Sequence, residues 1–109
     1  MTIKLVTDST CDIPSQVAQE LGITVVPFYV RFGYETYRDG IDLSPESFYR
    51  KLSQGRKLPA TSAPAPGIFA EVYKKLACEA DEIVSIHVSS KFSVSYESAL
   101  KGREQVREA

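Results

Sequence analysis

Residues 3–14 read IKLVTDSTCDIP, and they contain a strand signal followed by a helix signal. Ile3–Val6 is a short apolar run that favours a strand, and the polar cluster Thr7–Thr10 ends it. Asp12 and Pro14 are typical of a helix opening, because aspartate caps free backbone N–H groups and proline suits the first turn. The stretch therefore predicts a strand that passes through a hydroxyl-rich turn into a helix.

Strand-like runs recur farther along the chain. Thr24–Val30 is β-branched and aromatic and predicts a second strand, in which Pro27 removes one ladder donor and so suggests an edge position or a local irregularity. Tyr34–Tyr37 alternates in polarity and predicts the second arm of a hairpin. Glu82–Val88 predicts a further strand, which leads into a polar loop over residues 89–93.

Helical periodicity separates these strands. The first predicted helix ends at Gly22, as glycine commonly does after a last helical turn. Ser44–Pro45 predicts the start of a second helix, which ends at Gly55. Residues 56–67 are rich in proline and predict a loop, and residues 69–76 carry apolar side chains at helical spacing. A last helix is predicted after the polar loop.

Strands that alternate with helices indicate an α/β fold with a mostly parallel sheet and helices on both faces. A length of 109 residues allows one small domain, over residues 1–109. Few strands are recognisable, and the last element is a helix with no closing strand. We therefore expect this domain to be the front part of a larger protein.

The composition describes a folded chain with no strong charge preference. Apolar residues make up 43% and charged residues 25%, and 13 Lys+Arg against 14 Asp+Glu give a net charge of −1. This balance provides no basic surface for nucleic acid or for an anionic membrane. The longest nearly apolar run, Ile23–Val30, is far shorter than the ~20 residues that cross a bilayer. Because we find no secretion signal, we expect a cytoplasmic protein.

Hydroxyl side chains gather in three places. Ser9–Thr10 follow the first strand, Ser89–Ser93 follow the strand over residues 82–88, and Thr61–Ser62 lie in the proline-rich loop. Ligands of open parallel sheets bind beyond the carboxyl ends of the strands, and hydroxyls with free N–H groups at helix starts hold an anion without a cation. The clusters therefore predict an anion pocket, although each one also fits simple helix capping.

Motifs of known enzyme classes are missing from the sequence. GxSxG, GxGxxG and the P-loop pattern are absent, and the SxxK match at residues 98–101 lies inside the last predicted helix. Asp8, Cys11 and His87 are the candidate bases of an enzyme that acts on a small phosphorylated or carboxylated metabolite. A structural role is favoured for Cys11 and His87, and no catalytic residue is assigned. Because Cys11 and Cys78 form no CxxC pair, we expect no metal site and no cofactor.

Five segments, in order along the chain, resemble the signature of the DegV family of bacterial fatty-acid-binding proteins. They are residues 7–14 (TDSTCDIP), 22–27 (GITVVP), 37–45 (YRDGIDLSP), 61–66 (TSAPAP) and 86–99 (IHVSSKFSVSYESA). The fourth is similar to the family's TSxPxP loop, and the fifth is similar to its SS-x-LSGTY segment. Each segment alone is a match of modest specificity, but the five occur in the family's order and together cover the chain.

The resemblance implies the N-terminal α/β domain of a two-domain DegV-like fold, with the second domain absent from residues 1–109. It implies a long-chain fatty acid between the two domains, whose carboxylate is held by Thr61 and Ser93, with Ser62 adjacent. Supporting positions are Ser9, Thr10, Ser89, Ser90 and Val94. Val94 stands where the family has glycine, and Ala63 stands where it usually has glutamine.

The resemblance also implies a carrier and not an enzyme. Members of the family present the fatty acid to a fatty acid kinase, which makes acyl phosphate for phospholipid synthesis, so the binding protein supplies no catalytic residue. Two alternatives stay open: the enzyme domain described above, and a fragment that only keeps the fold. Such a fragment would expose the face that meets the second domain and would tend to dimerise through it.

Overall fold

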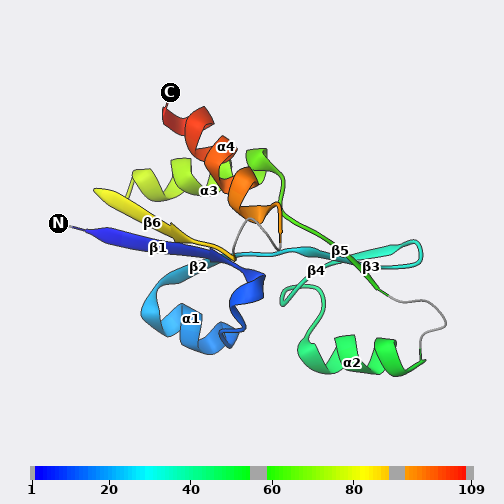
Figure 1. Ribbon diagram of the computed structural model, residues 1–109. Helices are drawn as coiled ribbons and strands as arrows, with labels where there is room; N and C mark the ends of the chain where they lie inside the picture. The colour runs from blue at the N-terminus through cyan, green and yellow to red at the C-terminus, as the bar shows by residue number, and fades with distance from the viewer. Residues whose placement is uncertain (1, 55–58, 89–92, 108–109) are drawn as a thin grey trace.

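Two three-stranded sheets form the framework of the part of the chain that the structure describes, residues 2–54, 59–88 and 93–107. In this computed structural model the elements are, in chain order, β1 (Ile3–Asp8), the 3-10 turn η1 (Ser9–Cys11), α1 (Ser15–Leu21), β2 (Ile23–Val26), β3 (Tyr29–Phe32), β4 (Glu35–Arg38), α2 (Pro45–Gln54), β5 (Ala60–Ser62), α3 (Pro66–Ala77), β6 (Glu82–Ile86) and α4 (Ser95–Arg107). The first sheet has the order β2-β1-β6, and the second has the order β4-β3-β5. Figure 1 shows the second sheet extending away from the carboxyl ends of the first-sheet strands.

The first sheet is parallel, with β1 at its centre. Val6 of β1 pairs with Thr24 of β2 and with Ser85 of β6, and its side chain is almost completely buried. The helix α1 covers one face of this sheet, and α3 and α4 cover the other (Figure 1). The predicted α/β fold, with a parallel sheet and helices on both faces, is therefore confirmed. The second sheet is antiparallel, and only its β3–β4 hairpin was predicted.

Pro27 divides one predicted strand into two. The run predicted as a single strand, Thr24–Val30, forms the end of β2 and the start of β3, which belong to different sheets. Proline has no N–H group and cannot continue a strand ladder. The N–H of Phe28 donates instead to the Ser9 hydroxyl, at 3.0 Å. The prediction of one strand is therefore wrong, and the chain passes between the two sheets at the irregularity that Pro27 indicated.

The proline-rich segment predicted as a loop contains a strand. Ala60–Ser62 forms β5 and pairs antiparallel with β3, so that Thr61 lies opposite Val30. Prolines occupy the flanking positions 59 and 64, and the three residues of β5 keep their N–H groups for the ladder. The prediction of a loop over residues 56–67 is therefore wrong for β5, and also for the first turn of α3, which begins at Pro66.

Asp12 does not cap the first helix. Its backbone lies in the left-handed region, with φ of 56°, where it closes the turn η1. The helix α1 begins at Ser15 after Pro14, and no side chain caps it. Gly22 ends α1 as predicted, with φ of 69° and its N–H donating to the Gln19 carbonyl at 3.2 Å. Aspartate tolerates the left-handed conformation better than most residues, which explains why it fits the turn.

The second helix, α2, starts where its sequence predicts. The Ser44 hydroxyl accepts the N–H of Ser47 at 3.1 Å, which is the expected cap. The Phe48 ring packs against Phe32 of the second sheet, with 5.9 Å between ring centroids. The predicted end at Gly55 lies outside the described residues. In the described part of the chain, no helix combines the length and the apolar character needed to cross a membrane.

The core of the first sheet depends on close contact between α3 and α4. Phe69 of α3 is completely buried, and Tyr73, Leu76, Ala99, Val6 and Val26 complete the buried cluster. Gly102 of α4 lies directly over Phe69. A Cβ atom at Gly102 would be 2.7 Å from the Phe69 Cβ and 2.8 Å from the carbonyl oxygen of Pro66. The absence of a side chain at this position therefore sets the distance between the two helices.

We predict that Gly102→Ala lowers the free energy of unfolding by about 2 kcal/mol, although alanine favours helices more than glycine does. The helix-propensity gain is at most about 1 kcal/mol, and overpacking a core costs about 1–3 kcal/mol. Urea unfolding followed by circular dichroism measures the difference.

Gly67→Ala is the matched control for Gly102→Ala. Gly67 also lies in a helix, and a Cβ there would meet no atom within 4 Å. The Gly67→Ala substitution should leave the free energy of unfolding unchanged or raise it slightly. Equal effects of the two substitutions would show that the α3–α4 contact does not limit stability.

Candidate functional site

The three residues predicted to hold a carboxylate line one cavity. Thr61, Ser62 and Ser93 face a cavity of about 690 Å³, together with Thr10 and Val94 from the predicted supporting set. Its remaining lining residues are Phe28, Val30, Asp39, Ala63 and Val88. Hydroxyls and apolar side chains therefore share a single space, which we call the hydroxyl cavity.

Three segments, distant in the sequence, supply the hydroxyl side chains of this lining. Thr61 and Ser62 lie on β5, at the edge of the second sheet, and Thr10 lies in η1, after the carboxyl end of β1. Ser93 precedes α4, and its hydroxyl accepts the N–H of Ser95 at 3.1 Å. Ser93 thus satisfies a backbone donor at the start of α4, as capping predicts, while it also lines the cavity.

The other predicted supporting residues, Ser9, Ser89 and Ser90, are not among the described residues that line the hydroxyl cavity. Ser9 lies in a neighbouring cavity of about 510 Å³ with Cys11 and Asp12, and its hydroxyl is bonded to the N–H of Phe28. Ser89 and Ser90 lie outside the described residues. Among the described residues that line the hydroxyl cavity there is no lysine or arginine, and Asp39 contributes a carboxyl group. An anion held there would depend on hydroxyl and backbone donors.

The carboxylate of Asp8 connects the segments around this cavity. Asp8 is completely buried, and its Oδ1 accepts the Thr10 N–H at 3.0 Å and the Thr10 hydroxyl. Its Oδ2 accepts the Ser95 hydroxyl at 2.7 Å and faces Nδ1 of His87 at 2.8 Å. Burial raises the pKa of Asp8, but the hydrogen bonds from Thr10, His87 and Ser95 outweigh it and hold the pKa below the ordinary value of 3.8.

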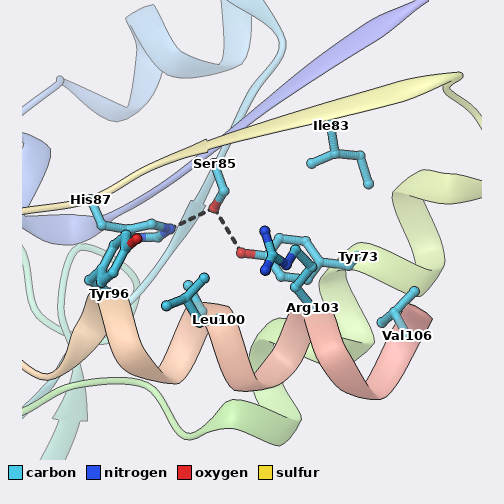
Figure 2. A pocket seen from close by; sticks show the side chains of 9 residues that line it. Tyr73, Ile83, Ser85, His87, Tyr96, Leu100, Arg103 and Val106 are labelled. Atoms are coloured by element: carbon cyan, nitrogen blue, oxygen red, sulfur yellow. Dashed lines mark hydrogen bonds between the residues drawn. The ribbon is translucent and has the colours of Figure 1, made fainter. Parts of the chain in front are cut away.

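His87 extends this network into a second cavity. Since the anionic Asp8 only accepts, Nδ1 of His87 donates to it, and Nε2 of His87 lies 2.5 Å from the Ser85 hydroxyl oxygen. The Tyr73 hydroxyl is hydrogen-bonded to Ser85 Oγ at 2.8 Å (Figure 2). Tyr73, Ser85 and His87 line a cavity of about 400 Å³ between β6 and α4. The order Asp8–His87–Ser85 is that of an acid–base relay.

The sequence indicates single members of this network but not their connection. Asp8 and His87 were candidates for a base, and neither was predicted to bind the other across 79 residues of sequence. Ser85, Tyr73 and Ser95 carried no signal, because serine and tyrosine in strands and helices are usually explained by packing or capping. Parallel pairing of β1 with β6 brings Asp8 close to His87 and Ser85, and Tyr73 and Ser95 join them from α3 and α4.

Relatives in sequence come from one family. A family model described as an uncharacterised protein of the DegV family matches residues 2–109. A DegV domain-containing protein of Halalkalibacterium halodurans is 49% identical over 105 residues, which are 95% of this chain and 37% of that protein. The protein DegV of Bacillus subtilis is 39% identical over 99 residues, 91% of this chain and 35% of that protein. The chain thus spans little more than a third of the length of these relatives.

Solved structures resemble the chain over nearly all of its length. DegV of Bacillus subtilis, described as a fatty acid binding protein, matches with a TM-score of 0.92 and 38% identity, over 97% of this chain and 38% of that one. A DegV family protein from Thermus thermophilus, described by its fatty acid binding, matches with a TM-score of 0.86 and 40% identity, over 96% and 38% of the two chains. A stearic acid-binding protein from Eubacterium ventriosum has a TM-score of 0.87 and 31% identity, over 97% and 37%.

We predict that Asp8→Asn lowers the free energy of unfolding at neutral pH by about 3 kcal/mol, because an amide group would face several donors in a buried position. The folded-state pKa of Asp8 is lowered, so its contribution to stability is present above the unfolded-state value and is lost as pH falls through the folded-state value. Urea unfolding at a series of pH values should show the difference from the unmodified chain shrinking below about pH 4.

Asp12→Asn is the control for Asp8→Asn, since Asp12 is exposed and asparagine also suits its left-handed backbone. It should change stability by less than about 0.5 kcal/mol. A pH-independent difference between the Asp8→Asn variant and the unmodified chain would contradict the assigned role of the Asp8 charge.

Proposed function

The chain belongs to the DegV family, and from this premise and the geometry above we propose that it binds the carboxylate end of a long-chain fatty acid. The solved relatives described as fatty acid binding proteins support this proposal. The observation that carries it is the shared cavity, in which Thr61, Ser62 and Ser93 face the same space.

The lining of the hydroxyl cavity suits a ligand with one polar end and one apolar end. Thr61, Ser62 and Ser93 supply hydroxyl donors, and Phe28 and Val30 are buried apolar residues of the same lining. A carboxylate bonded by the hydroxyls would leave its alkyl chain to continue along the apolar side. Val94, which is 63% exposed and follows Ser93 in the chain, also lines the cavity and would contact the first methylenes.

Burial of the acyl chain sets the affinity, and the hydroxyls set the orientation. Each buried methylene contributes roughly 0.8 kcal/mol, so a long acyl chain contributes on the order of 10 kcal/mol before costs. A hydrogen bond to an ionised carboxylate contributes about 1.5–3 kcal/mol. A cavity of about 690 Å³ accommodates part of a long-chain fatty acid. In a chain as long as the relatives, the rest of the acyl chain would lie against the additional polypeptide, which residues 1–109 do not include.

Residues 1–109 would act as the N-terminal domain of a two-domain carrier that works in the cytoplasm. The carrier would present its fatty acid to a fatty acid kinase, which forms the acyl phosphate for phospholipid synthesis. A site without a lysine or arginine clamp among its described lining residues suits this transfer, because no strong ion pair must break before the phosphoryl group arrives. The chain itself would supply no catalytic residue.

One observation favours an enzyme as the second candidate. Asp8, His87 and Ser85 are joined in the order in which an acid–base relay activates a serine for attack on a carbonyl carbon. The adjoining cavity is lined by Leu100 and Val106 and by the cation of Arg103, which would suit an acyl ester with an anionic group. The carrier remains our proposal, because Ser85 Oγ is already held between Tyr73 and His87.

We predict that Thr61→Val combined with Ser93→Ala weakens palmitate binding by about 10–100-fold, because the carboxylate loses two hydroxyl donors worth about 1.5–3 kcal/mol each before compensation by water. Calorimetric titration measures the affinity, and mass spectrometry of lipid extracted from the purified proteins measures retention. Both are carried out on this chain and on a version extended to the length of its relatives.

Thr36→Val is the control for the loss of a hydroxyl from the second sheet, since Thr36 lies exposed on β4 and outside the cavity lining. It should leave palmitate affinity unchanged. Unchanged affinity and unchanged co-purified lipid in the double variant would refute the proposed carboxylate site.

The enzyme candidate is tested at Ser85. The carrier proposal predicts that the chain neither hydrolyses p-nitrophenyl butyrate above background nor reacts with a fluorophosphonate probe. Hydrolysis or labelling that Ser85→Ala abolishes and Thr36→Val preserves would favour the enzyme over the carrier.

A further inference from the structure

A second carboxyl group lies in the cavity that is proposed to bind the carboxyl group of a fatty acid. The Asp39 N–H donates to the Phe28 carbonyl at 2.9 Å, which extends the pairing of β3 with β4 by one position. Val30 pairs with Tyr37 of β4 and with Thr61 of β5. Because side chains two positions apart in an extended chain share a face, Asp39 lies on the face that carries Val30 and Thr61. All three residues line the hydroxyl cavity.

Two cations flank this part of the second sheet, and each is paired with another acid. Arg38, the preceding residue, bonds both carboxyl oxygens of Asp42, at 2.9 and 3.0 Å, and lies on the opposite face of β4. Lys51 of α2 lies 3.7 Å from the Glu35 carboxyl group. Neither cation lines the hydroxyl cavity, and Asp39 is the one ionisable side chain in its described lining. The Asp39 charge is therefore not balanced by a described cation of the cavity.

Further acidic groups surround the cavity from the side of the first sheet. Asp8 is buried next to Thr10, and its carboxylate accepts the Thr10 N–H and hydroxyl. His87 is bonded to Asp8 and lines the cavity of about 400 Å³ instead. The neighbouring cavity of about 510 Å³, to which Asp39 also contributes, adds the acidic groups of Cys11 and Asp12. An ionised ligand head in the hydroxyl cavity therefore adds a negative charge to a region that already holds the charges of Asp8 and Asp39.

The hydrogen-bonding groups of the cavity include acceptors as well as donors. The Thr10 hydroxyl donates to Asp8 Oδ1, so the Thr10 oxygen offers only lone pairs to a ligand. The ionised carboxyl group of Asp39 also only accepts. A fatty acid carboxylate has no proton to donate to either acceptor, whereas a protonated carboxyl group donates one hydrogen bond and still accepts from the three hydroxyls of the proposed site. The lining therefore matches the protonated head group better than the anion.

We propose that the fatty acid is bound with one proton shared between its carboxyl group and the carboxyl group of Asp39. This inference rests on the proposed function and specifies the chemical form of its ligand. Two carboxyl groups that share a site without a cation ionise together only at a large cost, so they retain one proton between them. Because the free fatty acid is ionised at neutral pH, binding takes this proton from the solvent. Asp39 thereby favours a head group that can be protonated over one that keeps its charge.

The carbon NMR signal of palmitate, isotopically labelled at its carboxyl carbon, tests the proposal, because its chemical shift reports the protonation state of the bound head group. The pH titration is carried out on this chain and on a version extended to the length of its relatives. We expect the pKa of the bound carboxyl group to lie about 1–2 pH units above its ordinary value of about 4–5, and Asp39→Asn to remove most of that rise. Asp12→Asn, which removes an exposed carboxyl group of the neighbouring cavity, should preserve the rise.

The pH dependence of affinity provides a second measurement on the same proteins. A pKa of the bound head group that is raised by about 1–2 pH units weakens binding of the anion by about 10–100-fold. The affinity of the unmodified chain for palmitate, measured by calorimetric titration, should therefore fall by that factor between about pH 5 and about pH 8. The affinity of the Asp39→Asn variant should change by less than about threefold over the same range.

The outcomes separate this proposal from the proposed function. A bound carboxyl group that titrates at its ordinary pKa, or a raised pKa that Asp39→Asn leaves unchanged, would overturn the shared proton while fatty acid binding itself stands. The absence of a bound palmitate signal in both chain lengths would overturn the proposed function and the shared proton together. If Asp39→Asn does not fold, Asp39→Ser takes its place, and an ordinary pKa in the unmodified chain remains decisive on its own.

Discussion

The buried carboxylate of Asp8 is the interaction on which the arrangement of the site depends. It ends β1 and accepts hydrogen bonds from the turn η1, from the start of α4 and from His87, beyond the end of β6. A buried charge is tolerated only when such donors surround it. Because these donors come from three parts of the chain, satisfying one anion holds the carboxyl end of the parallel sheet together and places Thr10 beside the segment that carries Ser93.

The hydroxyl cavity exists because the chain changes sheets beside this anion. Pro27 interrupts the ladder of β2, Phe28 turns its N–H to Ser9, and β3 begins a second sheet that brings β5 to the carboxyl edge of the first. Val30 of the second sheet, the hydroxyls of β5 and the hydroxyls of Thr10 in η1 and Ser93 before α4 then face one space. This arrangement suits a ligand whose free energy of binding comes from an alkyl chain and whose orientation comes from a carboxylate.

Much of this organisation could be predicted from local sequence signals. Ser44, Pro45 and Gly22 set helix ends that the structure confirms, because caps and left-handed glycines act through neighbouring backbone groups. The prediction that Asp12 caps the first helix was wrong, because aspartate is common both at helix caps and in tight turns. The strand β5 has only three residues, which are too few to show the alternating pattern of a strand. Its formation depends on pairing with β3, which is distant in the sequence.

Local sequence patterns are sufficient to predict the residue types at the site and the parallel α/β class, because hydrophobic periodicity and cap chemistry operate over a few residues. The folded chain, in contrast, is needed to show that Thr61 and Ser93 share a cavity, that Gly102 lets α4 approach Phe69, and that His87 lies between Asp8 and Ser85. These contacts join residues far apart in the chain. They arise from strand order and helix packing, which are set by the burial of the whole core and not by any local pattern.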